Sequence, residues 1–135
     1  MPIQRAFASV FATDLGAVRD FYVSLFGWRI DYDSDWFVHL QAPDNPAVEL
    51  GIIRRDHEIV PEADRNPPAG TLVTIVVEDV DALHATAAER DIPIVEPPRN
   101  LFYGQRRMLL RDPAGTLVDV SSECPPSEEF LASFK

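Results

Sequence analysis

The amino-acid sequence predicts an α+β fold in which two βαβββ repeats form a half-open curved sheet. An apolar, strand-like run that ends in an acid occurs twice, as FASVFATDL at residues 7–15 and as LVTIVVEDV at residues 72–80. The acids that end these runs, Asp14 and Asp79, are 65 residues apart, and so are the first residues of the runs. A repeat of this size within 135 residues predicts two supersecondary units packed together.

The length and an apolar content of 46% predict one globular domain, residues 1–135. The expected parts are repeat one at 3–54, a linker at 55–70, repeat two at 71–122 and a C-terminal tail at 123–135.

In the first repeat, residues 3–11 predict a strand and Asp14 predicts the N-cap of a helix that ends at Gly27. Apolar residues in that helix follow i, i+3, i+4, i+7 spacing, which gives one buried face. Three further strands are expected at 28–32, 36–41 and 47–54, separated by turns at 33–35 and 43–46.

A polar, proline-containing stretch at 57–70 predicts the linker. The second repeat starts with a strand from Thr71, and Asp79 is expected to cap its helix. Residues 96–99 are expected to form a loop, and Ser127 to cap a short helix in the tail. The remaining strands are expected at 92–95, 105–110 and 116–121.

The chain carries 12 basic and 22 acidic residues, a net charge of −10. This charge argues against nucleic acid or an anionic membrane as a partner, and it attracts cationic ligands. The single cysteine, Cys124, excludes an intrachain disulfide. The absence of a signal peptide and of a membrane-length apolar run predicts a cytoplasmic protein.

Two groups of residues, taken in their order and spacing, resemble the vicinal oxygen chelate superfamily. That superfamily includes glyoxalase I, extradiol dioxygenases and bleomycin-resistance proteins. The resemblance covers residues 7–122 and implies the half-open sheet of two βαβββ units. Its markers are Asp14-Leu15 followed by Phe21-Tyr22 and Leu25-Phe26-Gly27, and the hairpin at 111–115 followed by Val118-Asp119-Val120.

In metal-dependent members, each repeat supplies one ligand from its first strand, usually His or Gln, and one Glu from its last strand. The resemblance places these positions on Phe7 and Glu49 in repeat one, and on Leu72 and Asp119 in repeat two. Phe and Leu cannot coordinate a metal, so only two carboxylates remain as weak metal candidates. We therefore expect no cofactor, with a divalent metal ion as the alternative, to which His39 could add a nitrogen ligand.

Strand alternation places Ser9 and Phe11 on the face of Phe7, which predicts an apolar cavity that contains the two acids. Water, Arg106 or Arg107, or a ligand donor could satisfy the acids. The loop from Phe102 and Tyr103 to Gln105 and Arg106 resembles the antibiotic-binding branch of the superfamily, where such loops line the drug pocket. Trp36 could extend the aromatic wall, although these aromatics could equally be core or dimer contacts.

These features predict a homodimeric protein that binds and sequesters a small aromatic or cationic compound, an antibiotic or natural product, and so confers drug resistance. The alternative is a metal-dependent lyase, isomerase or dioxygenase of the glyoxalase type. A third reading is a metal-free enzyme with Glu49 or Asp119 as general base. The predicted ligand-binding residues are Phe7, Ser9, Phe11, Trp36, His39, Glu49, Leu72, Phe102, Tyr103, Gln105, Arg106 and Asp119.

Overall fold

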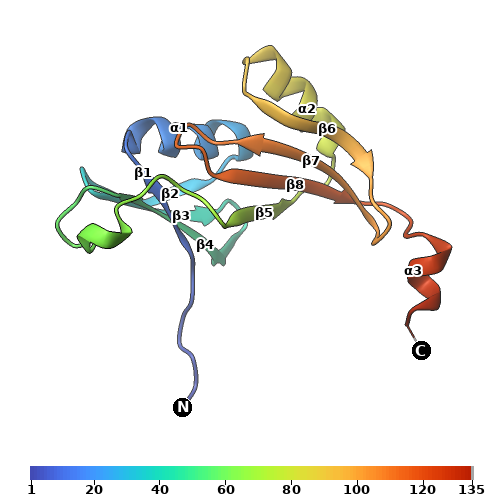
Figure 1. The fold of residues 1–135 in the computed structure, drawn as a ribbon, viewed down its shortest axis with the longest axis horizontal. Helices are drawn as coiled ribbons and strands as arrows, with labels where there is room; N and C mark the ends of the chain where they lie inside the picture. The colour runs from blue at the N-terminus through green and yellow to red at the C-terminus, as the bar shows by residue number, and fades with distance from the viewer. Residues whose placement is uncertain (135) are drawn as a thin grey trace. The chain divides into compact units, whose positions relative to one another are not determined.

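A computed structural model describes residues 1–134 of the chain. The chain divides into two compact units, each built around its own four-stranded sheet (Figure 1). The first unit comprises Met1–Gly70 and Pro113–Thr116. The second comprises Thr71–Asp112 and the residues from Leu117 onward.

The first unit has the predicted βαβββ order. Its elements are β1 (Ser9–Ala12), α1 (Leu15–Phe26), β2 (Arg29–Asp33), β3 (Phe37–Ala42) and β4 (Asn45–Arg54). The strand order is β1-β4-β3-β2, in which β1 and β4 are parallel and the other pairs antiparallel. A 3₁₀ turn, Glu62–Asp64, follows in the predicted linker.

Helix α1 begins and ends as the sequence predicts. The Asp14 carboxylate accepts a hydrogen bond from the Ala17 N–H at 3.1 Å, and Gly27 ends the helix with a φ of 77°. The predicted apolar spacing gives the buried face of the helix, which packs on β3 and β4. Its buried residues are Leu15, Val18, Phe21, Tyr22 and Leu25.

The first strand is shorter than predicted, because it begins at Ser9 and not at residue 3. The first backbone contact of the segment to the sheet is the hydrogen bond from the Gly51 N–H to the Ala8 carbonyl at 2.9 Å. Ile3, whose apolar side chain suggested a strand, is 85% exposed and finds no core to cover. Figure 1 shows this N-terminal segment leaving the sheet.

The second unit repeats the same topology. Its elements are β5 (Leu72–Val76), α2 (Val80–Glu89), β6 (Ile94–Asn100), β7 (Gln105–Arg111), β8 (Leu117–Glu123) and α3 (Glu128–Ala132). The strand order is β5-β8-β7-β6, again with one parallel pair, β5 and β8. Asp79 caps α2 and Ser127 caps α3 through their side chains, as predicted.

Two predicted loops are parts of strands. Residues 96–99 belong to β6, whose pairing with β7 is irregular around Pro97 and Pro98. Because β6 lies at the sheet edge, its prolines cost few ladder hydrogen bonds. β4 likewise begins at Asn45, inside a predicted turn.

Each sheet gathers its apolar core residues on one face. The alternate residues Val38, Leu40, Leu50 and Ile52 are buried in the first unit, and Met108, Leu110, Val118 and Val120 in the second. The predicted α+β class is therefore confirmed, and the residues between these buried positions face the other side of each sheet. Among the described residues, no helix combines the length and apolar character needed to cross a membrane.

Candidate ligand-binding face

The face of the first sheet that points away from α1 gathers most of the site residues predicted in the first repeat. His39 on β3 lies opposite Gly51 on β4, and Gly51 lies opposite Ser9 on β1. One pleat along β4, Glu49 lies opposite Gln41. Because strand side chains alternate, these residues point to the face opposite the buried leucine and valine side chains.

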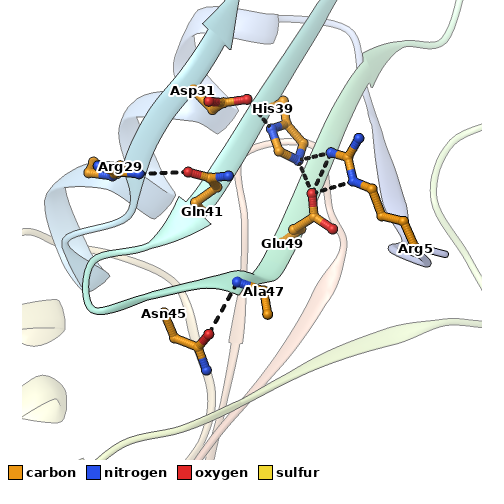
Figure 2. A network of polar contacts seen from close by, with 8 residues as sticks. All are labelled: Arg5, Arg29, Asp31, His39, Gln41, Asn45, Ala47 and Glu49. Carbon is orange, nitrogen blue, oxygen red and sulfur yellow. Dashed lines mark hydrogen bonds and ion pairs between the residues drawn. The ribbon is translucent and has the colours of Figure 1, made fainter.

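His39 and Glu49 form the centre of a polar network (Figure 2). His39 Nε2 lies 2.7 Å from Glu49 Oε1, and His39 Nδ1 lies 2.8 Å from Asp31 Oδ2 on β2. The side chains of His39 and Glu49 are 5% and 7% exposed, whereas that of Asp31 is 50% exposed. The imidazole is therefore fixed in orientation by a carboxylate on each ring nitrogen.

Arg5, from the segment before β1, completes this network. Its Nε donates to Glu49 Oε1 at 2.7 Å, and its Nη2 contacts both Glu49 Oε1 and His39 Nε2, the latter at 2.8 Å. The guanidinium also lies over the Phe7 ring, 4.8 Å from its centroid. The Arg5 side chain remains 55% exposed.

The three close contacts among Arg5 Nη2, His39 Nε2 and Glu49 Oε1 cannot all be hydrogen bonds at once. If His39 Nε2 carries a proton, it donates to Glu49 and faces an Arg5 donor. If His39 Nε2 is unprotonated, it accepts from Arg5 and faces the acceptor Glu49. Arg5 is therefore held less firmly than its contacts suggest in the first state, whereas in the second state the unfavourable contact is between His39 and Glu49.

Arg5 also determines the charge state of Glu49. Its hydrogen bond lowers the pKa of Glu49, burial opposes this by raising the pKa, and the hydrogen bond with His39 lowers it further. Glu49 thus stays ionised in a nearly buried position because it has two donor partners.

Aromatic rings lie beside the neighbouring residues His39 and Gly51. The Phe7 ring meets the His39 ring edge-on, with centroids 5.2 Å apart. A Cβ atom at Gly51 would lie 3.1 Å from both the Phe7 ring and the Phe37 ring, so the glycine lets the two rings approach the sheet. The ring centroids of Trp36 and Phe37 lie 5.4 Å apart.

Phe11 and Ser9 lie on the same side of β1, because the alternate residues Val10 and Ala12 are buried toward the core. Phe11 is half-buried and Ser9 exposed.

The matching face of the second sheet holds Asp119. Thr74 on β5 lies opposite it, and the Thr74 hydroxyl donates to Asp119 Oδ2 at 3.3 Å. Asp119 is 9% exposed, and its Oδ1 has no hydrogen-bond partner within the described residues. Burial raises the pKa of Asp119, while Thr74 and the charge of Arg107 oppose that rise.

The two repeats therefore carry their acids at different positions of equivalent strand pairs. Leu72 lies opposite Leu117, so the residue that faces Asp119 is Thr74. In the first sheet, Ser9 corresponds to Thr74 and Gly51 corresponds to Asp119. Glu49 lies two residues before Gly51 on β4. The acids predicted at equivalent positions are thus displaced by two residues.

The predicted loop before β7 splits between two environments. Phe102, although 65% exposed, contacts Tyr103 and the Phe130 ring of α3, the latter with centroids 5.7 Å apart. Arg106 bonds Asp81 of α2, with Nε 3.0 Å from Oδ2, and so lies on the helix side of the sheet.

Gln105 and Arg107 alternate with Arg106 and lie on the face of Asp119. Their Gln105 Oε1 and Arg107 Nε atoms are buried without a hydrogen-bond partner in the part of the chain that the structure describes.

The donors present do not fit the family-type metal centre. Within residues 1–134 no group of three or more His, Cys, Asp or Glu side chains is arranged to hold a metal ion. Where Glu49 and His39 meet, the third group is the Arg5 guanidinium, which carries positive charge. A metal ion would have to replace that cation, and the Phe7 position supplies no ligand.

Sequence reasoning missed three participants. The sequence predicts Arg5 within a strand, indicates no role for Asp31, and offers Arg107 only as an alternative to Arg106. The period-two alternation of β7 could have separated Arg107 from Arg106, because Met108 and Leu110 define its buried side.

Comparison with known proteins gives one family and many structures. The family model described as Glyoxalase/Bleomycin resistance protein/Dioxygenase superfamily matches residues 4–120. No curated protein is similar enough to the chain to count as a match.

Three solved structures illustrate the likeness in fold. A superfamily member from Sphaerobacter thermophilus DSM 20745 is 22% identical, with a TM-score of 0.74 over 90% of this chain and 98% of that one. A lactoylglutathione lyase from Agrobacterium tumefaciens is 20% identical, with a TM-score of 0.69 over 90% and 96%. A glyoxalase/bleomycin resistance protein/dioxygenase from Alicyclobacillus acidocaldarius is 19% identical, with a TM-score of 0.64 over 95% and 96%.

Proposed function

Since the chain belongs to the glyoxalase/bleomycin resistance protein/dioxygenase superfamily, we propose that it binds and sequesters a small aromatic or cationic compound on the first sheet. The observation that carries this proposal is a nearly buried carboxylate, Glu49, which contacts His39 beside the Phe7 ring, on a face that no helix in the described part of its own unit covers. Rings supply stacking surfaces, and the carboxylate supplies one strong polar anchor. An antibiotic or another natural product with a flat ring and a cationic group would match both features of the site.

Sequestration needs no chemical step. The protein would hold the compound away from its target, and resistance to the compound would follow. The apolar Phe7 and Leu72 positions support this function over metal catalysis, because neither side chain can replace a lost metal ligand.

Ligand titration of the purified protein tests this function. Trp28→Phe would leave Trp36, which lies beside Phe37, as the only tryptophan reporter. We expect at least one compound in a panel of aromatic antibiotics to quench Trp36 fluorescence, and Glu49→Gln to weaken that binding. Glu58→Gln removes the same charge from an exposed residue after β4 and should leave binding unchanged. A folded protein that responds to no compound in the panel would contradict the proposal.

A second candidate function is metal-free proton transfer, which one observation favours. His39 is oriented by Asp31 at 2.8 Å, and its Nε2 points to the same place as Glu49. An oriented imidazole beside a carboxylate is a general acid–base arrangement. Mass spectrometry of the bound compound separates the two functions, since sequestration returns it unchanged and catalysis returns a product.

We also propose a homodimer. Leu72 and Val76 on the edge strand β5 are 45% and 61% exposed, an apolar edge that a second chain could cover. Light scattering at several protein concentrations tests this, and a monomer throughout would refute it.

A further inference from the structure

We propose that the site around Glu49 and His39 selects a planar cation, a guanidinium or amidinium group, which takes the place of the Arg5 guanidinium. This inference rests on the proposed function, because it names the ligand chemistry of the same face. The Arg5 side chain is then an internal stand-in for the ligand.

The contacts of Arg5 define what the site recognises. Two of its nitrogens meet one oxygen of Glu49, and its plane lies over the Phe7 ring. A carboxylate with an aromatic ring beside it is the usual environment of a guanidinium in proteins. A free guanidinium or amidinium ligand can make the same hydrogen bonds and the same ring contact.

Charge restricts the replacement to a cation. Without Arg5, the His39 imidazole lies between two carboxylates, Asp31 at 2.8 Å and Glu49 at 2.7 Å. Even a doubly protonated imidazole leaves this group with a net negative charge. A ligand without positive charge would take water from Glu49 without replacing the Arg5 hydrogen bonds, so an anionic or apolar ligand is a poor substitute for Arg5.

Arg5 is well placed to leave. It precedes the first strand, and the Gly51-to-Ala8 hydrogen bond is the first backbone link to the sheet within the described residues. Its side chain is half exposed, and when His39 Nε2 carries a proton that ring nitrogen and the Arg5 guanidinium are two donors facing each other. Release therefore breaks few backbone contacts and, in that state of His39, relieves one poor contact.

Tethering gives the inference a measurable consequence. A ligand must compete with a group held at the site by the chain itself, which lowers the apparent affinity by the fraction of open sites. Removing the Arg5 charge should therefore strengthen the binding of a small cation, although it removes a side chain from the site.

Benzamidine is the probe, measured by isothermal titration calorimetry with the full chain. We expect Arg5→Gln to bind it about tenfold or more tightly than the unmodified protein, as expected when an intramolecular competitor is lost. Adding Glu49→Gln to Arg5→Gln should abolish the binding. Arg29→Gln is the matched control, because Arg29 is an exposed arginine of the same sheet that bonds Gln41 at 2.7 Å. It should change the affinity less than twofold if general charge effects are small.

Three results would overturn the inference: equal or weaker binding by a folded Arg5→Gln protein, equal gains from Arg5→Gln and Arg29→Gln, or tighter binding of benzoate than of benzamidine by the unmodified protein. Circular dichroism establishes that the variants are folded. The inference and the proposed function can fail separately. If neutral aromatic antibiotics bind and benzamidine does not, only the inference fails. Conversely, benzamidine could bind Arg5→Gln while no compound in the panel binds the unmodified protein.

Discussion

Gly51 lies at the centre of the aromatic face, and replacing it with alanine should disturb binding more than folding. The new Cβ would collide with the Ser9 hydroxyl and lie 3.1 Å from both the Phe7 and Phe37 rings. The Ser9 side chain can rotate away, but the two rings must move outward by a few tenths of an ångström.

The energy of this change is a balance of two effects. Overpacking of a well-packed site costs about 1–3 kcal/mol. Replacing a strand glycine returns about 0.5–1 kcal/mol, because alanine loses less conformational freedom on folding. A net loss of about 1 kcal/mol lowers the Tm of a 135-residue protein by about 3–5 °C.

Thermal unfolding followed by circular dichroism measures this loss, and the fluorescence titration measures the effect on binding. Gly16→Ala is the control, because its Cβ would meet Arg19 Nη2 at 3.5 Å and Asp14 Oδ1 at 3.8 Å, both ordinary contacts. In α1 that change should stabilise the protein by about 0.5–1 kcal/mol. If Gly51→Ala raised the Tm as Gly16→Ala does, the aromatic rings would not pack against Gly51 as described.

Three further predictions concern stability. Burial raises the pKa of Asp119 in the folded state. The stability that the protonated carboxyl contributes is therefore complete below the unfolded pKa and is lost as pH rises through the folded pKa. The free energy of unfolding of Asp119→Asn, relative to that of the unmodified protein, should be larger at pH 7.5 than at pH 4. Urea unfolding at the two pH values checks this, and an equal difference at both would contradict it. The pH dependence of stability has the opposite sign at Glu49, because Arg5 lowers the pKa of Glu49 in the folded state. Glu49→Gln should therefore cost stability at neutral pH, and progressively less as pH falls through that lowered pKa. Met108→Ala should cost about 2–5 kcal/mol in urea unfolding, because the side chain is fully buried, whereas Leu131→Ala at a 56% exposed position should cost far less.

The parts of the fold that depend on local chemistry were predictable from the sequence. Asp14, Asp79 and Ser127 cap helices through their own side chains, and Gly27 ends α1 with a positive φ. Strand ends were less predictable, because they depend on whether a neighbouring strand pairs with the segment and a core lies beneath it. The segment around Ile3 is apolar enough for a strand but has no core to cover, and β6 continues through residues that read as a loop.

The site was predictable only in part for the same reason. Alternation along β4, which is a local rule, predicts the face of Glu49, but the sequence leaves open whether His39 faces the same cavity; the pairing of β3 with β4 places it there. Arg5 reaches Glu49 across 44 residues of sequence, and Asp31 reaches His39 across a sheet pairing that contains a bulge. No periodicity in the chain encodes either contact.

The different position of the acid in each repeat makes the protein asymmetric in chemistry although its topology is duplicated. Glu49 has an arginine and a histidine as partners, whereas Asp119, one pleat out of step, has a threonine hydroxyl and a raised pKa. Because the apolar faces carry most of the packing, the polar face of each sheet can change residue by residue without a matching change in the other repeat. Duplication thus leaves this chain with two carboxylates in different chemical settings, one held ionised by an arginine and one whose pKa burial raises.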